Sequence, residues 1–412
     1  MGKSNGSIQN AVEKMDSCKL DAKNKYEVYI PHKNSDEKLP LLVIVDAHGS
    51  GKFALNKFKL SADKYPAIIV ASDYVKNGFE GFENAIQTLI DDANQKYPVN
   101  KTLFLAGFSG GARMALGYAS NHTVDGLILC GALADAQQLK SLACPVFSIS
   151  GMDDFNFMET AQYLFQDETT PTNLKIELTN DSHGWPDSLM LANTFGFLQL
   201  SKVEKSSELT DYCNVQLSRI DSLKQKGDFL KAKLIARNMA FTTPFNTEKD
   251  FNSIYNGIKT NPNYVNQLNR LEETLNLEMQ IRQSYLKSFQ EKDIVWWKTE
   301  ISKLDESIKT EKDEFTCATY KRVKAFLGMV CYSYSKQAVT AHSAEMLDKI
   351  ISIYSNLEPE NPDMFYYGSF LFFWKNDYAK TVIMLNKARK AGFTDINQLK
   401  KDFPSSITSL IK

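Results

Sequence analysis

A serine flanked by glycines offers the clearest chemistry in the chain. Gly107-Phe108-Ser109-Gly110-Gly111 fits the pattern G-x-S-x-G, with the apolar run Leu103–Ala106 before it and the helix-forming run Ala112–Ala119 after it. A serine at such a strand-to-helix turn is held in a strained conformation, and glycines two positions either side remove the clashes. The first N–H groups of the helix then face developing negative charge. Ser109 is therefore predicted to be a nucleophile.

A serine hydroxyl needs a base, and the base needs an orienting carboxylate. The chain has five histidines, of which His183 follows the last predicted strand in the polar stretch Asn180-Asp-Ser-His-Gly-Trp-Pro. The strand at 146–150 is followed by Asp153 and Asp154, so either could be the acid. The resulting order, serine then aspartate then histidine, is the one expected on a parallel sheet with this turn.

A glycine-containing loop after an early strand could stabilise an oxyanion. The apolar run at 41–45 leads into His48-Gly49-Ser50-Gly51. We expect the backbone N–H groups of Gly49 and Ser50 to act with that of Gly110, and His48 to orient the loop rather than serve as base. The stretch Gly49–Lys52 is not a phosphate loop, because Asp46 replaces its first glycine and Phe53 its Ser/Thr.

The elements that must position these residues alternate between strand and helix. Strands are predicted at 25–30, 41–47, 67–72, 102–106, 126–130, 146–150 and 174–178, and helices at 82–97, 111–120, 157–165 and 187–202. Continuous apolar strands separated by helices predict an α/β fold with a mostly parallel, doubly wound sheet. Strand patterns stop near Leu200, and the remainder predicts an all-α, repeat-like region. The expected organisation is an N-terminal tether (1–24), a catalytic domain (25–203) and a helical domain (204–412).

With these residues assembled, the first half resembles the α/β-hydrolase superfamily. It is most similar to compact esterases of the polyhydroxybutyrate-depolymerase, feruloyl-esterase and dienelactone-hydrolase type. The resemblance is carried by the loop 48–51, the serine motif, Gly151-Met-Asp-Asp154 and His183-Gly-Trp-Pro. It implies Asp154 as the acid, with Asp153 the alternative, and an enzyme that uses no cofactor and no metal. Two departures are Asp46-Ala47 before His48, where relatives are usually apolar, and an acid loop without Val-Pro.

The neighbours of the predicted site suggest a substrate. Phe108, Phe155 and Trp185 are expected to line a shallow pocket, and the connection 133–144 is too short for a lid of several helices. The sequence thus favours hydrolysis of short-chain or aromatic, small-molecule carboxylic esters. Two alternatives stay open: a peptidase on the same fold, which needs the same groups, and a non-catalytic interaction protein that uses the helical domain.

The second half carries a weaker resemblance, to tetratricopeptide repeats. Lys226-Gly-Asp-Phe-Leu and Lys375-Asn-Asp-Tyr-Ala each precede small residues at helical spacing. The resemblance implies a domain that could bind a protein partner. The aromatic residues between Phe365 and Trp374 are expected to be core. At least one of Trp296 and Trp297 must face away from a one-sided core.

Composition excludes several classes of function. The chain has 412 residues and a formal net charge of −1, which gives no general attraction to nucleic acid. No apolar run approaches the roughly 18 residues that a membrane span needs. The six cysteines form no C-x-x-C pair. The polar start Met1-Gly-Lys-Ser-Asn-Gly-Ser resembles a tether, so we expect a bacterial cell-envelope lipoprotein or a secreted protein whose signal has been removed, with a cytoplasmic location as the alternative.

Overall fold

The computed structural model describes residues 8–34, 37–166 and 169–411, in two compact units, Met1–Glu272 and Glu273–Lys412. Each unit is described by itself. The first contains the sheet and the second is helical, so the predicted α/β class with a C-terminal all-helical region is confirmed. Residues 1–7 of the predicted tether lie outside the described residues.

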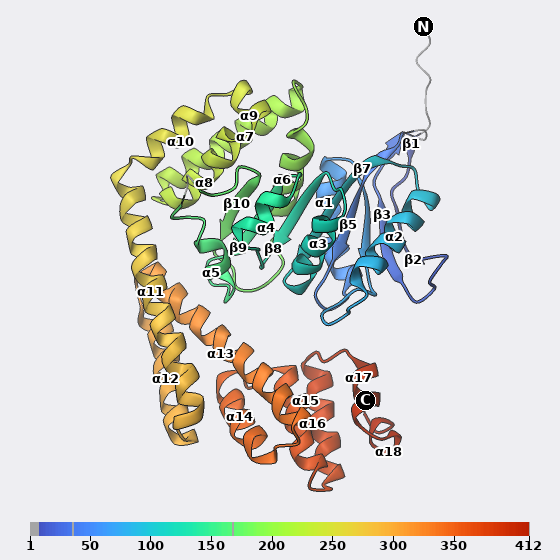
Figure 1. The fold of residues 1–412 in the computed structure, drawn as a ribbon, viewed down its shortest axis with the longest axis vertical. Helices are drawn as coiled ribbons and strands as arrows, with labels where there is room; N and C mark the ends of the chain where they lie inside the picture. Colours follow the sequence, from blue (N-terminus) through green and yellow to red (C-terminus); the bar gives the residue numbers. More distant parts are fainter. Residues whose placement is uncertain (1–7, 35–36, 167–168, 412) are drawn as a thin grey trace. The chain divides into compact units, whose positions relative to one another are not determined.

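An eight-stranded sheet forms the centre of the first unit (Figure 1). Its strands are β2 (Val12–Ser17), β3 (Lys25–Ile30), β5 (Leu39–Val45), β6 (Ile68–Ser72), β7 (Val99–Phe108), β8 (Gly126–Cys130), β9 (Val146–Gly151) and β10 (Leu174–Thr179). They lie in the order β10-β9-β8-β7-β5-β6-β3-β2, and β3 alone runs antiparallel to both of its neighbours. Counted along the chain, this is the order 1-2-4-3-5-6-7-8 of an α/β-hydrolase sheet. A separate antiparallel pair joins β1 (Ile8–Gln9) to β4 (Lys33–Asn34).

Helices cover the central strands, whose residues are buried on both faces. Every residue of β6, β8 and β9 is buried, as expected for parallel strands between two helical layers. The helices that follow the strands are α1 (Gly51–Lys64), α2 (Phe82–Lys96), α3 (Gly110–Asn121), α4 (Ala136–Ser141), α5 (Phe157–Ala161) and α6 (Ser188–Leu200). Helix α1 packs against α6, and α2 packs against α3. Sequence analysis did not predict α1, whose first residues, Gly51 and Lys52, continue a glycine-containing loop.

The described part of the predicted tether differs from the expectation, because it contributes strand β2 to the sheet. Val12–Ser17 pairs with Lys25–Ile30 along its whole length. The Asp16 carboxylate anchors this edge by accepting hydrogen bonds from Lys96 Nζ (3.0 Å) and Tyr97 Oη (2.6 Å).

The first unit continues well beyond the predicted boundary at residue 203. It includes α7 (Ser207–Gln225), α8 (Phe229–Ala240), α9 (Thr243–Glu248), α10 (Phe251–Lys259) and the start of α11 (Pro262–Glu291). Helix α8 lies along the edge strand β10, where Asn238 accepts from the Ile176 N–H (3.0 Å) and donates to its carbonyl (2.9 Å). A side chain thus takes the place of a further strand.

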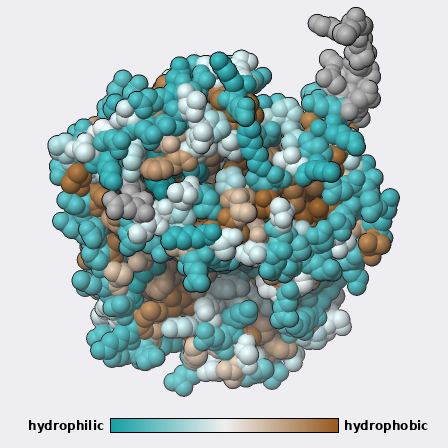
Figure 2. Space-filling view, turned by 45° about the horizontal axis from the view of Figure 1, so that its top comes forward, coloured by the Kyte–Doolittle hydropathy of each residue, from teal (hydrophilic) through white to brown (hydrophobic). Residues whose placement is uncertain are grey.

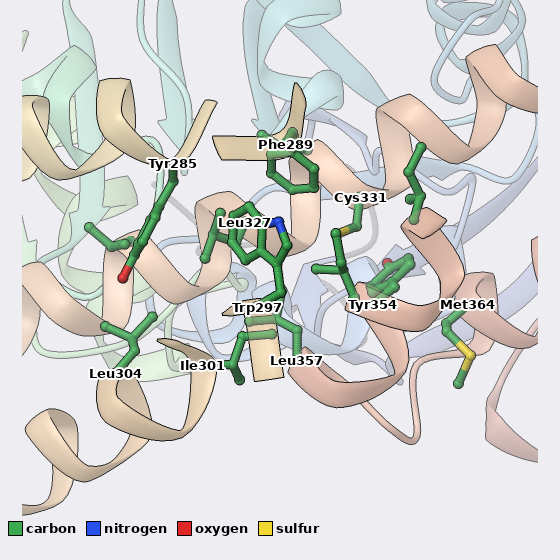
Figure 3. Packing of buried hydrophobic residues seen from close by; sticks show 14 residues of the cluster. Tyr285, Phe289, Trp297, Ile301, Leu304, Leu327, Cys331, Tyr354, Leu357 and Met364 are labelled. Carbon is green, nitrogen blue, oxygen red and sulfur yellow. The ribbon is translucent and has the colours of Figure 1, made fainter. Parts of the chain in front are cut away.

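The second unit is built from helical hairpins around an aromatic core. Beyond α11 it contains α12 (Ile294–Thr310), α13 (Glu314–Thr340), α14 (Ala344–Leu357), α15 (Pro362–Phe373), α16 (Tyr378–Ala391), α17 (Ile396–Asp402) and α18 (Ser405–Thr408). Figure 3 shows Trp297 among Phe289, Leu327 and Leu357. Trp297 is buried and Trp296 only partly so, as expected for adjacent positions on a helix. Of the aromatic residues predicted as core, Tyr366 and Phe370 are buried, whereas Phe365, Phe372, Phe373 and Trp374 are only partly buried.

The face of the molecule in Figure 2 is mainly hydrophilic, with hydrophobic residues in small patches. Among the described residues, no helix is both long and apolar enough to cross a bilayer.

Candidate active site

The turn at Ser109 has the strained geometry that the motif predicts. Strand β7 ends at Phe108, Ser109 has φ 54° and ψ −119°, and α3 begins at Gly110. A left-handed φ at a residue with a side chain costs on the order of 1–3 kcal/mol. The Ser109 N–H donates to the carbonyl of Cys130 at 2.8 Å, which ties the turn to β8.

Glycines next to this turn are required by contact. A Cβ atom on Gly107 would lie 2.4 Å from the carbonyl oxygen of Gly111, and one on Gly111 would lie 2.1 Å from that of Val45. Both distances are far below van der Waals contact. The two glycines therefore let β7, β5 and the start of α3 approach closely enough to present Ser109 at the carboxyl edge of the sheet.

The structure brings Ser109, His183 and Asp154 into one hydrogen-bonded line. His183 Nε2 lies 2.9 Å from Ser109 Oγ, and His183 Nδ1 lies 2.9 Å from both carboxylate oxygens of Asp154. Asp154 is 1% exposed, and its Oδ1 also accepts the Asn156 N–H at 2.8 Å. Its neighbour Asp153 is only partly buried. Of the two candidate acids, Asp154 is the one that contacts the imidazole.

The loops that carry the acid and the histidine are bonded to each other. The Met152 N–H donates to the carbonyl of Thr179 (2.9 Å), and the Asp153 N–H to that of Asp181 (3.2 Å). At Gly151 a Cβ atom would lie 2.0 Å from the Asp181 carbonyl oxygen, so glycine permits this close approach. The loops at the carboxyl ends of β9 and β10 thus hold Asp154 and His183 next to each other.

The predicted oxyanion loop has its N–H groups committed within the loop. The Gly49 N–H donates to the carbonyl of Asp46 (3.1 Å), and the Ser50 N–H to the Asp46 carboxylate (3.3 Å). Gly49 has φ 67°, the left-handed conformation that glycine favours. Gly110, the third predicted donor, begins α3 beside the nucleophile. A Cβ atom there would meet the Asn77 carboxamide at 1.6 Å, so the Asn77 side chain lies against Gly110.

Two of the three predicted pocket residues, Phe108 and Phe155, pack against the imidazole of His183, and the third, Trp185, packs against Phe108. The rings of Phe155 and Phe108 lie 4.3 and 4.7 Å from that of His183, measured between centroids. Phe108 and Trp185 are 6% and 9% exposed, so they offer little surface to a substrate, whereas Phe155 is partly exposed. Phe108 and Phe155 therefore support His183 at least as much as they border a pocket.

Sequence analysis marked Asp46 as a departure from the relatives and as a mismatch to a phosphate loop, and gave it no role at the site. In the structure the Asp46 carboxylate is buried and accepts hydrogen bonds from the His48 N–H (2.8 Å) and from Trp185 Nε1 (2.7 Å). Burial opposes its ionisation, but the hydrogen bonds from His48 and Trp185 outweigh burial and lower the pKa of Asp46. The available signal was a carboxylate placed directly after a buried strand.

Two further observations concern the phosphate-loop stretch and possible metal ligands. The Lys52 ammonium, which belongs to the rejected phosphate-loop reading, pairs with Glu13 on strand β2. Within residues 8–34, 37–166 and 169–411, no three His, Cys, Asp or Glu side chains are grouped so that they could hold a metal ion.

Comparisons with known proteins add a likeness of fold. No family model matches the chain, and no curated protein matches it. Among solved structures, an esterase of Rhizomucor miehei is 14% identical over 47% of this chain and 85% of its own, with a TM-score of 0.39. Est1E of Butyrivibrio proteoclasticus is 15% identical over 48% and 100%, with a TM-score of 0.37. An acylaminoacyl peptidase of Pyrococcus horikoshii is 11% identical over 47% and 41%, with a TM-score of 0.35. At these identities the likeness concerns the fold alone.

Proposed function

We propose that this protein is a serine hydrolase that cleaves carboxylic esters through Ser109, His183 and Asp154. The observation that carries the proposal is the continuous hydrogen-bonded line from the buried Asp154 carboxylate, through the imidazole, to Ser109 Oγ. Such a line at a strained strand-to-helix turn is the arrangement that makes a serine hydroxyl nucleophilic.

The geometry assigns each group a step. Asp154 accepts from Nδ1–H of His183 and so leaves the Nε2 lone pair directed at Ser109 Oγ. Nε2 takes the hydroxyl proton as Oγ attacks the ester carbonyl, and it then returns that proton to the leaving alcohol. A water molecule, deprotonated by the same imidazole, hydrolyses the acyl-enzyme. The reaction needs no cofactor in this scheme.

The oxyanion is assigned first to the N–H of Gly110, which begins α3 beside Ser109 and benefits from the helix dipole. The loop containing Gly49 and Ser50 borders the same position in our proposal. Both predicted donors of this loop, the N–H groups of Gly49 and Ser50, bond to Asp46 in the structure. We therefore assign Gly110 as the main oxyanion donor.

The substrate class follows from the open surroundings of the site. The connection between β8 and β9 contains only the six-residue helix α4, so it provides no lid of several helices. Without an apolar lid, a long acyl chain gains little buried area. We expect short-chain or aromatic esters, with Phe155 as the partly exposed contact.

Covalent labelling tests the nucleophile. A fluorophosphonate should label the wild-type protein and the Ser141→Ala variant, which changes an exposed serine of α4, but not Ser109→Ala. Asp154→Asn should lower kcat for p-nitrophenyl butyrate by about 10³- to 10⁴-fold, and Asp153→Asn far less. Labelling of Ser109→Ala at the wild-type rate would refute the proposal.

A substrate panel tests the bond and the chain length. The kcat/KM values should be highest for acetyl and butyryl esters and should fall for octanoyl and palmitoyl esters. An optimum at octanoyl or longer would contradict the open site. Cleavage of peptide amides at rates comparable to esters would make the protein a peptidase, which uses the same groups.

Partner binding by the helical second unit remains a prediction. Its hairpin of α15 and α16 resembles a tetratricopeptide pair, but the buried aromatic residues Tyr366 and Phe370 belong to its core. A pull-down with residues 273–412 as bait, compared with the first unit, would test the prediction.

A further inference from the structure

One buried carboxylate joins two loops that are far apart in the sequence. Asp46 directly follows strand β5 and is 3% exposed. Its Oδ1 accepts the N–H groups of His48 (2.8 Å) and Ser50 (3.3 Å), and its Oδ2 accepts Trp185 Nε1 (2.7 Å). Trp185 lies two residues after His183, so the same side chain contacts the loop after β5 and the loop that carries the base.

The ring of Trp185 continues this connection towards the nucleophile. Its centroid lies 5.5 Å from that of Phe108 and 5.7 Å from that of Phe58, in an edge-on contact with Phe58. Phe108 immediately precedes Ser109, and its ring also packs on the imidazole of His183. The hydrogen bond to Asp46 therefore fixes the one polar atom of a ring that otherwise packs among aromatic neighbours of the site.

We propose that Asp46 is a positioning residue that acts through Trp185 and through the loop 46–50, holding the base loop and the loop beside the nucleophile in register. The inference rests on the proposed serine hydrolysis and goes beyond the triad. Hydrogen bonds to a carboxylate are shorter and roughly twice as strong as neutral ones, which suits a joint between two loops. An asparagine could not replace it, because its NH₂ group would face an N–H donor on one side.

This role predicts a specific kinetic effect. Displacing reacting groups by about 1 Å can cost on the order of 100-fold in rate. Asp46→Asn should therefore lower kcat by about 10- to 100-fold, with KM changed by no more than about twofold, because no contact with bound substrate is removed. Trp185→Phe should lower kcat by a smaller factor. The double variant should be no slower than Asp46→Asn alone, since both changes break the same joint.

The matched control is Asp92→Asn. Asp92 is another buried carboxylate of the first unit, and it accepts the Lys19 N–H and the Tyr26 hydroxyl, far along the chain from both loops. This variant should lower Tm while kcat stays at the wild-type value. It distinguishes the general effect of losing a buried carboxylate from the specific effect of losing the Asp46 contacts that connect the two loops.

An NMR measurement detects the hydrogen bond between Asp46 and Trp185 independently of catalytic activity. In protein with ¹⁵N-labelled indoles, the Trp185 resonance, identified by its loss in Trp185→Phe, should shift upfield in Asp46→Asn as its hydrogen bond weakens. A wild-type protein that neither hydrolyses esters nor reacts with fluorophosphonate would refute the proposed function, and the positioning role with it. An active wild type whose Asp46→Asn variant shows the shift but keeps kcat within about twofold would overturn this inference alone. Additive losses in the double variant would also overturn it.

Discussion

Two helical hairpins share a local sequence pattern but pack in different ways. Gly227-Asp228 separates α7 from α8, and Asn376-Asp377 separates α15 from α16. Gly227 and Asn376 both have a left-handed φ, of 80° and 58°. Each aspartate then caps the next helix, accepting a backbone N–H three residues on at 3.1 Å. The local sequence thus sets the same turn and the same helix start in both places.

What the two second helices contact is different. Helix α8 meets strand β10 through polar groups, with Arg237 donating to the Leu174 carbonyl (3.1 Å) and Asn238 bonded to both backbone groups of Ile176. Helix α16 meets α15 through apolar residues, with Leu385 and Ala388 fully buried in its cluster. A turn motif therefore identifies a hairpin, whereas the side chains on its buried face decide which unit it joins.

The contrast also explains why the first unit extends beyond its last strand. An edge strand exposes unpaired N–H and C=O groups, which must be covered or bonded. Helix α8 supplies these partners to β10, and Arg219 of α7 forms a bidentate pair with Glu177 of the same strand (2.6 and 3.1 Å). The strand pattern stops near residue 200, but the partners that complete the last strand come later.

Truncation before the first hairpin should have the largest effect on folding. A chain ending at residue 203 loses the partners of β10 and leaves the Lys175 and Glu177 side chains without their helical cover, so we expect it to aggregate or to bind hydrophobic dyes. A chain ending at residue 272 keeps them and should be soluble and labelled by fluorophosphonate. Gel filtration and near-ultraviolet circular dichroism of both chains provide the measurement. A well-folded 1–203 chain would show that α7 to α10 are dispensable to the sheet.

Much of the first unit could be predicted because its signals are local. Buried strands are continuous apolar runs, and each residue of the proposed triad follows the end of one, so the sequence alone predicted that Ser109, Asp154 and His183 lie at one edge of the sheet. Helix α1 was missed because it begins at Gly51, inside the glycine-containing stretch 48–51 that was interpreted as a loop. The role of Asp46 was missed because its partner, Trp185, is distant in sequence and no local pattern links the two.

Removal of a core leucine from the second hairpin should be the next largest effect. Leu385→Ala in α16 leaves a cavity in the apolar cluster and should cost about 2–5 kcal/mol. Hydrogen exchange should show faster opening confined to residues 273–412, and the kcat of the proposed ester hydrolysis should be unchanged. Leu410→Ala, which alters an exposed leucine of the same unit, is the control. Loss of esterase activity in Leu385→Ala would contradict the independence of the two hairpins.

A polar substitution in the first hairpin should have a smaller effect. Asn238→Ala leaves the N–H and C=O of Ile176 without their side-chain partner and should cost about 1–3 kcal/mol in urea unfolding. The corresponding position of α16 is Lys387, which is exposed, so Lys387→Ala should stay within about 0.5 kcal/mol of wild type. Equal effects at both positions would mean that the contact of α8 with β10 contributes nothing beyond the helix itself.

A pH dependence is expected at the same contact. Lys175 of β10 is 2% exposed, and its Nζ donates to the carbonyls of Thr172 and Phe241, both at 2.9 Å. Burial, with repulsion from Arg237 as a second cause, lowers the pKa of Lys175 to about 7. In the unfolded chain the amine titrates near about 10.4.

The sign of the effect follows from proton binding. Between pH 7 and 10 the unfolded chain holds a proton on Lys175 that the folded chain has released, so this group makes stability rise with pH in that window. Below pH 7 both states are protonated, and the cost of the buried charge is fully present. The stability of Lys175→Met minus that of wild type, measured from urea midpoints, should therefore be larger at pH 6.5 than at pH 9. The control Lys140→Met, at an exposed position of α4, should match wild type at both pH values. If the stability difference between Lys175→Met and wild type does not change with pH, burying the Lys175 ammonium beneath α8 has no free-energy cost. The polar contact of the first hairpin would then be no more sensitive to pH than the apolar contact of the second.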